Sequence, residues 1–326
     1  MNGLPLSENI TTYIIAYNEA ETIARCINSF KAASDDFVVV LDDRTTDNTE
    51  KIAWDLGARV YHFHWIDDFS AARNYALDRC MHEWRMFADG DDVLDPESAD
   101  LVRQAVKYAN EKGINSIISH YYTSEADGKP LSDNAMTRLT RAGTMRWVGR
   151  IHEYQNNDKI HQIVTNIEVW HRKPVSRTEG TNRNIGMLEK AIPNCNPSEL
   201  PRYTFYYARE LMFGHRYLEA IEWFDKYIKI SNWEAEKHRA LCDKAECFYC
   251  MGDKKKADEV LAESILLNPK YPDPYVKRGI IAHELGNHDE CVVQFGLAKA
   301  RLANTHPLFS GGDLLPRLMT AYAGCE

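Results

Sequence analysis

The chain has 326 residues, of which 44% are hydrophobic and 27% charged, with 39 basic against 48 acidic side chains. This composition is ordinary for a folded protein and argues against disordered and fibrous architectures, and the length suggests two domains. The net charge of -9 argues against broad electrostatic binding to nucleic acid or anionic lipid, but it leaves a local basic groove open. We expect no membrane span, because the sequence contains no run of 18 apolar residues.

The N-terminal segment and the cysteines bear on the cellular compartment. Residues 1–8 lack a charged region followed by an apolar core, so we expect no signal peptide. Most of the eight cysteines lie in apolar helical patterns, and without a secretion signal we expect reduced thiols. These features predict a cytoplasmic protein.

Residues 11–120 alternate short apolar runs with amphipathic stretches. Strands are predicted over residues 11–16, 37–41, 59–63, 84–88 and 115–119. Helices are predicted over residues 19–30, 46–56, 69–81 and 96–108. This order predicts an α/β fold with a doubly wound, mostly parallel sheet, in which ligands bind beyond the carboxyl ends of the strands. Further strands are predicted over residues 136–139, 145–148 and 163–169.

From residue 201 the pattern is purely helical and repeats itself. Gly252 and Gly286 open two similar segments 34 residues apart, which is the period of a tetratricopeptide repeat. A looser copy surrounds Tyr217, with Gly214 one residue out of place. We therefore predict an all-α, tetratricopeptide-like domain over residues 201–326, a helical connector over 179–200 and a catalytic domain over 1–178.

Carboxylates follow three of the predicted strands. The segments are Tyr17-Asn18-Glu19, Asp42-Asp43 and Asp89-Gly90-Asp91-Asp92. Asp89 and Asp91 flank a glycine in a sharp turn, and two carboxylates so spaced can face one Mg²⁺ or Mn²⁺ ion while substrate phosphates complete its coordination. Asp92 is interpreted as a turn or helix-start residue. No phosphate-binding glycine loop of the G-x-x-x-x-G-K-[ST] or G-x-G-x-x-G type occurs, so a phosphate ligand would be held by metal and basic side chains.

Four segments carry a resemblance to a known family. IIAYNEAETIARCINSF, VVVLDDRTTDNT, DDFSAARNYAL and MFADGDDVL resemble the nucleotide-sugar-binding half of family 2 glycosyltransferases, in the family's order and spacing. The resemblance covers about residues 10–175 and implies a GT-A fold, inverting transfer and a nucleoside-diphosphate sugar donor, with a UDP-sugar favoured. Ala16 stands where relatives often carry proline, and Arg44-Thr45 stands where Gly-Ser is common.

The same resemblance implies how the donor is held. Tyr17, Glu19 and Asp43 would line the nucleoside pocket, and Arg73 would approach the phosphate or ribose. Asp89 would take part in donor binding through the metal.

The resemblance also implies the metal ligands. Asp89 and Asp91 would bind a divalent cation, Mn²⁺ or Mg²⁺, that bridges the diphosphate. His171 would be a third ligand, with a purely structural histidine as the alternative. The basic residues Arg172, Lys173, Arg177 and Arg183 follow it; they would clamp the diphosphate or form a solvated linker.

The general base is sought on the acceptor side, in residues 146–153. Trp147 would offer a platform for a sugar or acceptor, and Glu153 would take the proton from the attacking hydroxyl or thiol. His152 is a supporting or alternative residue. A surface His-Glu pair at a strand end is the structural alternative.

The acceptor remains open at this stage. The repeats suggest an extended acceptor or partner, because such arrays form concave grooves, and they could also support a homo-oligomer. A peptide or protein is one candidate acceptor and a glycan is another. A modified nucleobase in DNA is a further alternative, and so is a non-catalytic scaffold with a degenerate transferase domain.

Overall fold

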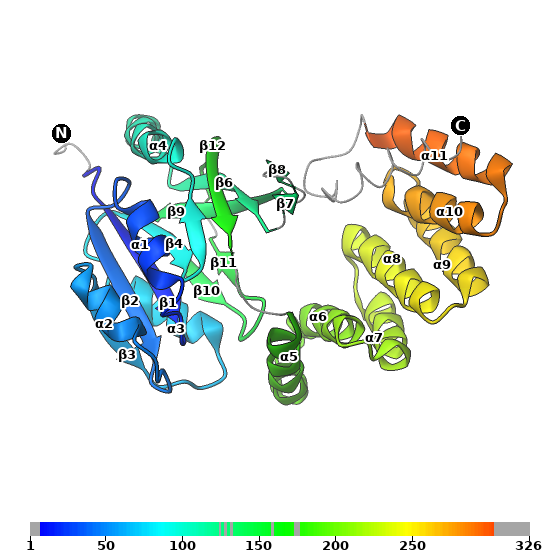
Figure 1. Ribbon diagram of the computed structural model, residues 1–326, viewed down its shortest axis with the longest axis horizontal. Coiled ribbons are helices and arrows are strands. Elements are labelled where there is room, and N and C mark those ends of the chain that lie inside the picture. Colours follow the sequence, from blue (N-terminus) through cyan, green and yellow to red (C-terminus); the bar gives the residue numbers. More distant parts are fainter. Residues whose placement is uncertain are drawn as a thin grey trace. The chain divides into compact units, whose positions relative to one another are not determined.

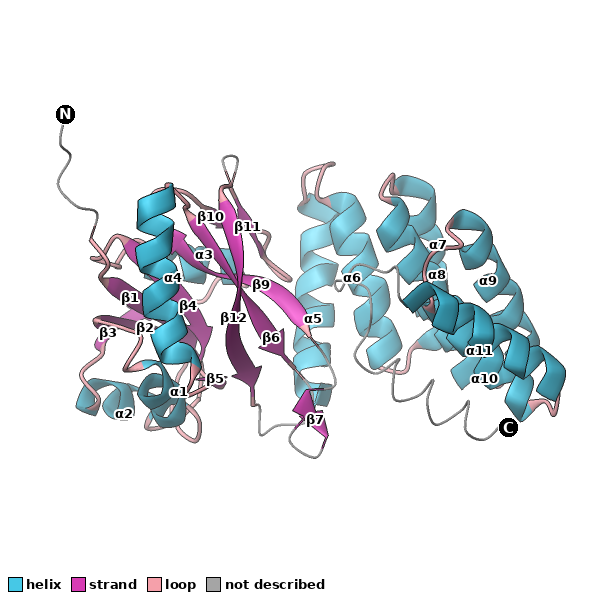
Figure 2. Cartoon of the chain, turned by 90° about the horizontal axis from the view of Figure 1, so that it is seen from above, coloured by secondary structure: helices cyan, strands magenta, loops and turns pink. Residues whose placement is uncertain are grey.

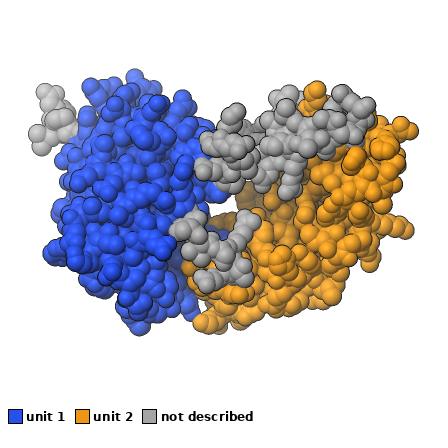
Figure 3. Space-filling view, viewed as in Figure 1, with its two compact units in different colours: residues 1–174 blue, residues 175–326 orange. Residues whose placement is uncertain are grey.

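The structure is a computed structural model that describes residues 7–123, 125–126, 129–130, 133–157, 160–172 and 177–302. The chain divides into two compact units, Met1–Pro174 and Val175–Glu326, coloured separately in Figure 3. Within the described residues, no helix combines the length and the apolar character needed to cross a membrane.

The first unit is built on an eight-stranded sheet with the order β3-β2-β1-β4-β9-β6-β12-β5 (Figure 1). These strands are β1 (Ile10–Ala16), β2 (Asp36–Asp42), β3 (Arg59–Phe63), β4 (Trp84–Asp89), β5 (Asp92–Leu94), β6 (Ser116–Tyr122), β9 (Asn134–Arg141) and β12 (Gln162–His171). Strands β3, β2, β1 and β4 are parallel, and β12 is parallel to β6. β9 runs antiparallel between β4 and β6, and β5 is antiparallel to β12. The predicted mostly parallel sheet is confirmed.

Helices cover both faces of this sheet, and Figure 2 shows α4 in front of the near face. The helices are α1 (Ile23–Phe30), α2 (Thr49–Asp55), α3 (Phe69–Leu77) and α4 (Ser98–Lys112). Side chains on a strand point alternately to the two faces, so β2 supplies two cores. Val39 and Leu41 pack with residues of α1, α2 and α4, whereas Val38 and Val40 pack with residues of α3. The doubly wound arrangement follows from this division.

Two short β-ribbons complete the unit: β7 (Glu125–Ala126) pairs with β8 (Lys129–Pro130), and β10 (Arg146–Val148) pairs with β11 (Tyr154–Asn156). Of these, β10 packs on α3, where Met145 and Trp147 join the same core as Val38 and Val40. This contact brings the predicted acceptor-side segment to the α3 face of the sheet.

The first helix begins later than predicted, at Ile23 instead of residue 19. Asn18 adopts the left-handed conformation, with φ 52°, and its side-chain oxygen accepts a hydrogen bond from Thr46 N at 2.9 Å. Glu19 N donates to Thr49 Oγ1 at 2.8 Å. These contacts hold the loops after β1 and β2 together, so the residues before Ile23 form a turn instead of a helical start.

The second unit is helical throughout its described residues. Its elements are α5 (Arg177–Ala191), the 3₁₀ turn η1 (Ile192–Asn194), α6 (Leu200–Phe213), α7 (Tyr217–Ile230), α8 (Glu234–Cys250), α9 (Lys254–Leu267), α10 (Asp273–Glu284) and α11 (His288–Leu302). Successive helices from α6 onward form three pairs, which confirms the tetratricopeptide-like prediction. Gly252 and Gly286 follow α8 and α10 with φ of +84° and +73°, a conformation in which glycine is favoured. In the first pair this conformation falls on His215, with φ +59°.

In the first repeat the left-handed position is thus occupied by a histidine instead of a glycine. We expect His215→Gly to raise the free energy of unfolding by about 0.5–1 kcal/mol, because a side chain is strained at positive φ. His215 Nδ1 also lies 2.7 Å from the Tyr217 hydroxyl, so the matched control is Tyr217→Phe, which removes that contact and keeps the backbone. Urea unfolding of the three proteins measures the change. A lower stability of the glycine variant than of Tyr217→Phe would contradict the prediction.

The expectation of reduced thiols holds only in part. Cys26, Cys80, Cys195, Cys242, Cys247 and Cys250 are free. Cys291 is disulfide-bonded, so the expectation is wrong at that position. Cys325 lies outside the described residues.

Candidate active site

The last residue of β4, Asp89, lies on the face of the sheet that α3 covers. Strand alternation places its side chain with that of Phe87, which packs in the α3 core. Arg73 of α3 donates from Nη2 to Asp89 Oδ1 at 2.7 Å and from Nε to Glu153 Oε1 at 2.5 Å. One guanidinium therefore joins the acidic turn after β4 to the carboxylate predicted as the base.

The surroundings keep this guanidinium charged and fixed. Arg73 is only 7% exposed, and its guanidinium lies over the rings of Phe87 and Trp147, at 5.3 and 4.9 Å from their centroids. Burial alone would lower the pKa of Arg73, but the carboxylates of Asp89 and Glu153 outweigh burial and raise it. Burial likewise opposes ionisation of Asp89, yet the neighbouring Arg73 lowers the pKa of this carboxyl overall.

The segment that carries Glu153 is held on α3 by hydrogen bonds to the segment's own backbone atoms. Asn74 pairs with the backbone of Trp147 in both directions, at 2.9 and 3.0 Å, and Phe69 N donates to Arg150 O at 2.8 Å. His152 turns the chain in the left-handed conformation, with φ 50°, immediately before Glu153. These contacts explain how a carboxylate distant in sequence reaches Arg73.

Trp147 differs from its predicted role as a platform. Its side chain is buried, and its indole nitrogen donates to the Tyr13 hydroxyl at 2.9 Å. The ring packs edge-on against Phe87 and beneath the Arg73 guanidinium. Trp147 therefore supports Arg73 from within the core instead of offering an exposed face to a sugar.

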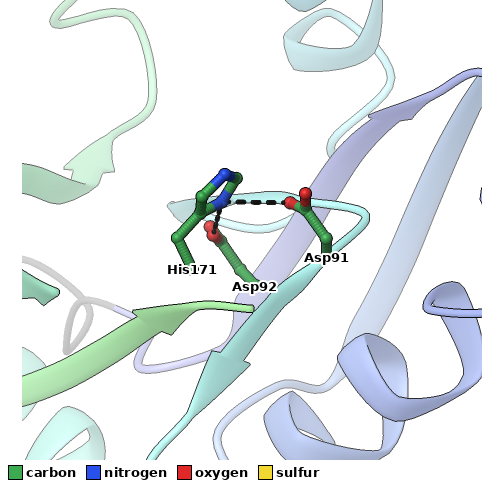
Figure 4. Close-up of side chains that lie close together, drawn as sticks. All are labelled: Asp91, Asp92 and His171. Carbon is green, nitrogen blue, oxygen red and sulfur yellow. Dashed lines mark hydrogen bonds and ion pairs between the residues drawn. The ribbon is translucent and has the colours of Figure 1, made fainter. Parts of the chain in front are cut away.

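A second cluster gathers beyond Gly90, where Asp91, Asp92 and His171 converge (Figure 4). His171 Nδ1 lies 3.1 Å from Asp91 Oδ1 and 3.4 Å from Asp92 Oδ1. The sheet register explains this meeting, because His171 ends β12 directly opposite Asp92 of β5. Burial alone would lower the pKa of His171, but hydrogen bonds to the two carboxylates outweigh burial and raise it to about 10.

Asp92 is a correction to the sequence interpretation. It begins the edge strand β5 instead of a turn or helix, and its carboxylate is fully buried. Arg138 Nη1 donates to its Oδ2 at 2.9 Å, and Asp89 N donates to the same oxygen at 3.0 Å. The Tyr121 hydroxyl donates to Oδ1 at 3.0 Å. Asp92 is thus a fixed support whose oxygens are already used by the protein.

The cluster has the donor set that a hard divalent cation prefers. One ligand atom from each of Asp91, Asp92 and His171 lies within 4.8 Å of the other two. Carboxylate oxygen and imidazole nitrogen suit Mn²⁺ and, with more oxygen ligands, Mg²⁺. Asp91 is the best-placed carboxylate, because Asp92 is engaged by Arg138. Asp89, which the sequence resemblance assigned to the metal, is not in this group among the described residues and instead pairs with Arg73.

The loops after β1 and β2 carry the residues predicted to line a nucleoside pocket, and the loop after β3 lies beside them. Tyr17 is 49% exposed, and the Arg44 guanidinium lies 5.5 Å from its ring centroid and 5.4 Å from that of Trp65. Two side-chain hydrogen bonds to Asp42, at 2.9 and 2.6 Å, fix the guanidinium. Trp65 was missed by sequence reasoning; its signal is the aromatic run after β3.

Asp43 and Glu19 also lie at this edge of the sheet. Asp43 Oδ2 is 2.6 Å from His64 Nδ1, and that hydrogen bond lowers the pKa of the Asp43 carboxyl. Glu19 Oε2 accepts a hydrogen bond from Thr22 at 2.7 Å, and a Cβ on Gly90 would lie 3.0 Å from Glu19 Cγ. The glycine of the acidic turn therefore permits close contact with the loop after β1.

The basic stretch that follows His171 begins beside the acidic cluster, where Arg172 N donates to Asp91 O at 3.1 Å. Arg183 is exposed on α5 of the second unit, where it contacts Asn184. Lys173 and the side chain of Arg177 lie outside the described residues.

Known glycosyltransferases are similar to this chain, chiefly over the first unit. Residues 11–171 match glycosyl transferase family 2. The SPbeta prophage-derived glycosyltransferase SunS of Bacillus subtilis is 31% identical over 231 residues, which are 67% of this chain and 53% of SunS. An uncharacterized glycosyltransferase of Rickettsia conorii is 37% identical over 97 residues, 30% of this chain and 34% of that protein. The chain thus spans about half the length of SunS and about a third of the rickettsial protein.

Two further similarities concern the repeats and the whole chain. A TPR repeat-containing protein of Synechococcus elongatus is 39% identical over 85 residues, 26% of this chain and 21% of that protein. The crystal structure of S. aureus TarS 1–349 in complex with UDP-GlcNAc covers 91% of this chain and 93% of its own, with a TM-score of 0.42 and 14% identity. Through residues 11–171, the chain belongs to glycosyl transferase family 2.

Proposed function

We propose that this glycosyltransferase is an inverting, metal-dependent enzyme that moves a sugar from a nucleoside-diphosphate donor, with a UDP-sugar favoured, to a peptide, protein or glycan acceptor. The observation that carries the proposal is the Arg73 bridge, which places the Glu153 carboxylate on the same guanidinium as the acidic turn after β4. An acceptor-side base and a donor-side acidic cluster within one site are the parts that a single displacement at the anomeric carbon requires.

The donor would bind along the carboxyl ends of β1, β2 and β4. Tyr17 offers an exposed ring for stacking, Asp43 a hydrogen-bond acceptor and Arg44 hydrogen-bond donors. A donor group beside an acceptor group complements the imide edge of uracil, which pairs carbonyl oxygens with one N–H. This pattern supports UDP as the nucleotide.

The diphosphate would reach the cluster of Asp91, Asp92 and His171. A divalent cation bound there supplies Lewis-acid stabilisation of the charge that develops on the leaving diphosphate. Asp91 and His171 would hold the cation, while Asp92 keeps His171 in place from the core. Asp89, on the other face of the turn, holds Arg73.

Glu153 would accept the proton of the attacking hydroxyl or thiol. The acceptor atom bonds to the anomeric carbon as the bond to the diphosphate breaks, and configuration inverts because there is one displacement. The tetratricopeptide-like pairs of the second unit favour an extended acceptor such as a peptide. We regard transfer to a modified nucleobase as a weaker alternative, since the net charge of -9 opposes binding to a polyanion.

Thermal-shift measurements with UDP-glucose, UDP-GlcNAc, UDP-galactose, GDP-mannose and dTDP-glucose, with and without Mn²⁺, test the proposal. We expect UDP-sugars to raise the melting temperature in the presence of Mn²⁺ and to do so less without it, because a ligand that binds only the native state stabilises it. UDP release from the responding donor then tests turnover. If no sugar nucleotide raises the melting temperature and none is hydrolysed, the protein is a scaffold with a degenerate transferase domain.

A further inference from the structure

We propose that Arg73 is a positioning residue for Glu153, and not a ligand of the donor's phosphate or ribose. This inference rests on the proposed function, because it concerns the base of the transfer reaction. The juxtaposition that carries it is one buried guanidinium held between two carboxylates, Asp89 from the end of β4 and Glu153 from the loop between β10 and β11.

No nitrogen of this guanidinium is available to bind the phosphates or ribose of a sugar nucleotide. Nε donates to Glu153 and Nη2 donates to Asp89. Nη1 is buried and has no hydrogen-bond partner among the described residues. The rings of Phe87 and Trp147 lie against the guanidinium. A diphosphate would have to displace a carboxylate or open the α3 core to reach Arg73. The arrangement therefore suits an intramolecular link between Asp89 and Glu153.

The same link orients the base. Arg73 engages Oε1 of Glu153, which leaves Oε2 as the oxygen that can take the acceptor's proton. Because Arg73 also holds Asp89, it sets where this oxygen lies relative to the acidic turn after β4. A misplacement of about 1 Å between reacting groups can cost about a hundredfold in rate. Arg73 would therefore contribute to the rate constant of transfer more than to donor affinity.

A lysine cannot replace this link, because its single ammonium group lacks the planar fork that serves two carboxylates. We expect Arg73→Lys to lower kcat for UDP release about a hundredfold, measured with the UDP-sugar that the wild-type protein turns over. The dissociation constant for UDP with Mn²⁺, measured by calorimetry, should stay within about threefold of the wild-type value. The matched control is Arg59→Lys, which alters another arginine–carboxylate pair, that of Arg59 with Asp36. This pair lies at the amino end of β3, away from the carboxyl ends of the strands, so both quantities should stay unchanged.

A double-mutant cycle tests whether Arg73 acts through Glu153 or independently of it. If Arg73 acts through Glu153, the double variant Arg73→Lys with Glu153→Gln should be no more than about threefold slower than Glu153→Gln alone. If the double variant instead loses kcat by the product of the two single losses, the inference is overturned. UDP binding weakened tenfold or more by Arg73→Lys would also overturn it, since that result marks a donor-binding arginine.

Two further outcomes complete the test. Should Arg73→Lys fail to fold, Glu153→Asp retains the carboxylate but shortens its reach to Arg73, and a kcat within threefold of the wild type would then overturn the inference. Absence of turnover in the wild-type protein with every donor overturns the proposed function and the inference with it. Turnover in the wild type together with single losses that multiply in the double variant overturns the inference alone.

Discussion

Replacing Arg138 by methionine is expected to lower the free energy of unfolding of the first unit by about 3–5 kcal/mol, because it leaves a buried carboxylate without its arginine partner. Arg138 and Asp92 are both fully buried and joined at 2.9 Å. The guanidinium also donates to Phe87 O at 3.1 Å and lies 4.2 Å from the Phe87 ring centroid. Without it, the Asp92 carboxylate keeps the Tyr121 hydroxyl, the Asp89 amide and, at the longer distance of 3.4 Å, His171 Nδ1.

The measurement is urea unfolding followed by hydrogen exchange of amides in β4 and β9, which reports on the first unit alone. The control is Arg59→Met, whose pair with Asp36 is partly exposed and should cost about 1 kcal/mol or less. A double variant, Arg138→Met with Asp92→Leu, should recover much of the loss, because it removes both members of the buried pair and leaves no carboxylate there without its arginine. If Arg138→Met costs no more than Arg59→Met, Asp92 does not depend on this pair.

The elements of the first unit could be predicted from sequence because their signals are local. A continuous apolar run such as that of β2 packs against helices on both faces, and the run itself shows this burial. The repeats could be predicted for a similar reason, since Gly252 and Gly286 mark the same backbone turn at a fixed interval. The acidic turn after β4 could be located because ligands bind beyond the carboxyl ends of parallel strands.

The roles within the site could not be assigned in the same way, because they depend on contacts between distant segments. Asp89 and Asp91 flank the same glycine, yet they contact different elements. Asp89 pairs with Arg73 of α3, and Asp91 lies beside His171 of β12. Strand alternation puts Asp89 on the α3 side of β4, whereas Asp91 lies beyond the turn at Gly90, next to the pairing of β5 with β12. The three residues of β5 are too few to show a strand periodicity, so the sequence around Asp92 indicates a turn or helix start instead of a strand.

This division makes Asp91→Asn the variant with the largest expected loss of activity. Asn keeps the size of the side chain but removes the charge that would hold a divalent cation beside His171. The loss of several kcal/mol of metal-assisted stabilisation predicts a decrease in UDP release of about a thousandfold. The Mn²⁺-dependent rise in melting temperature should disappear as well, which gives a readout that does not depend on turnover.

Asp89→Asn and Asp100→Asn are the informative comparisons. Asp100 is exposed in the first turn of α4, so its variant should retain both activity and the Mn²⁺ response. Asp89 holds Arg73, so its variant should lose activity yet keep the Mn²⁺-dependent rise in melting temperature. If Asp89→Asn abolishes the Mn²⁺ response as fully as Asp91→Asn does, both carboxylates bind the cation and the Arg73 pair must give way to it. If only Asp91→Asn does so, the two carboxylates of one D-x-D turn have different roles: one holds the metal and the other holds the arginine that positions the base.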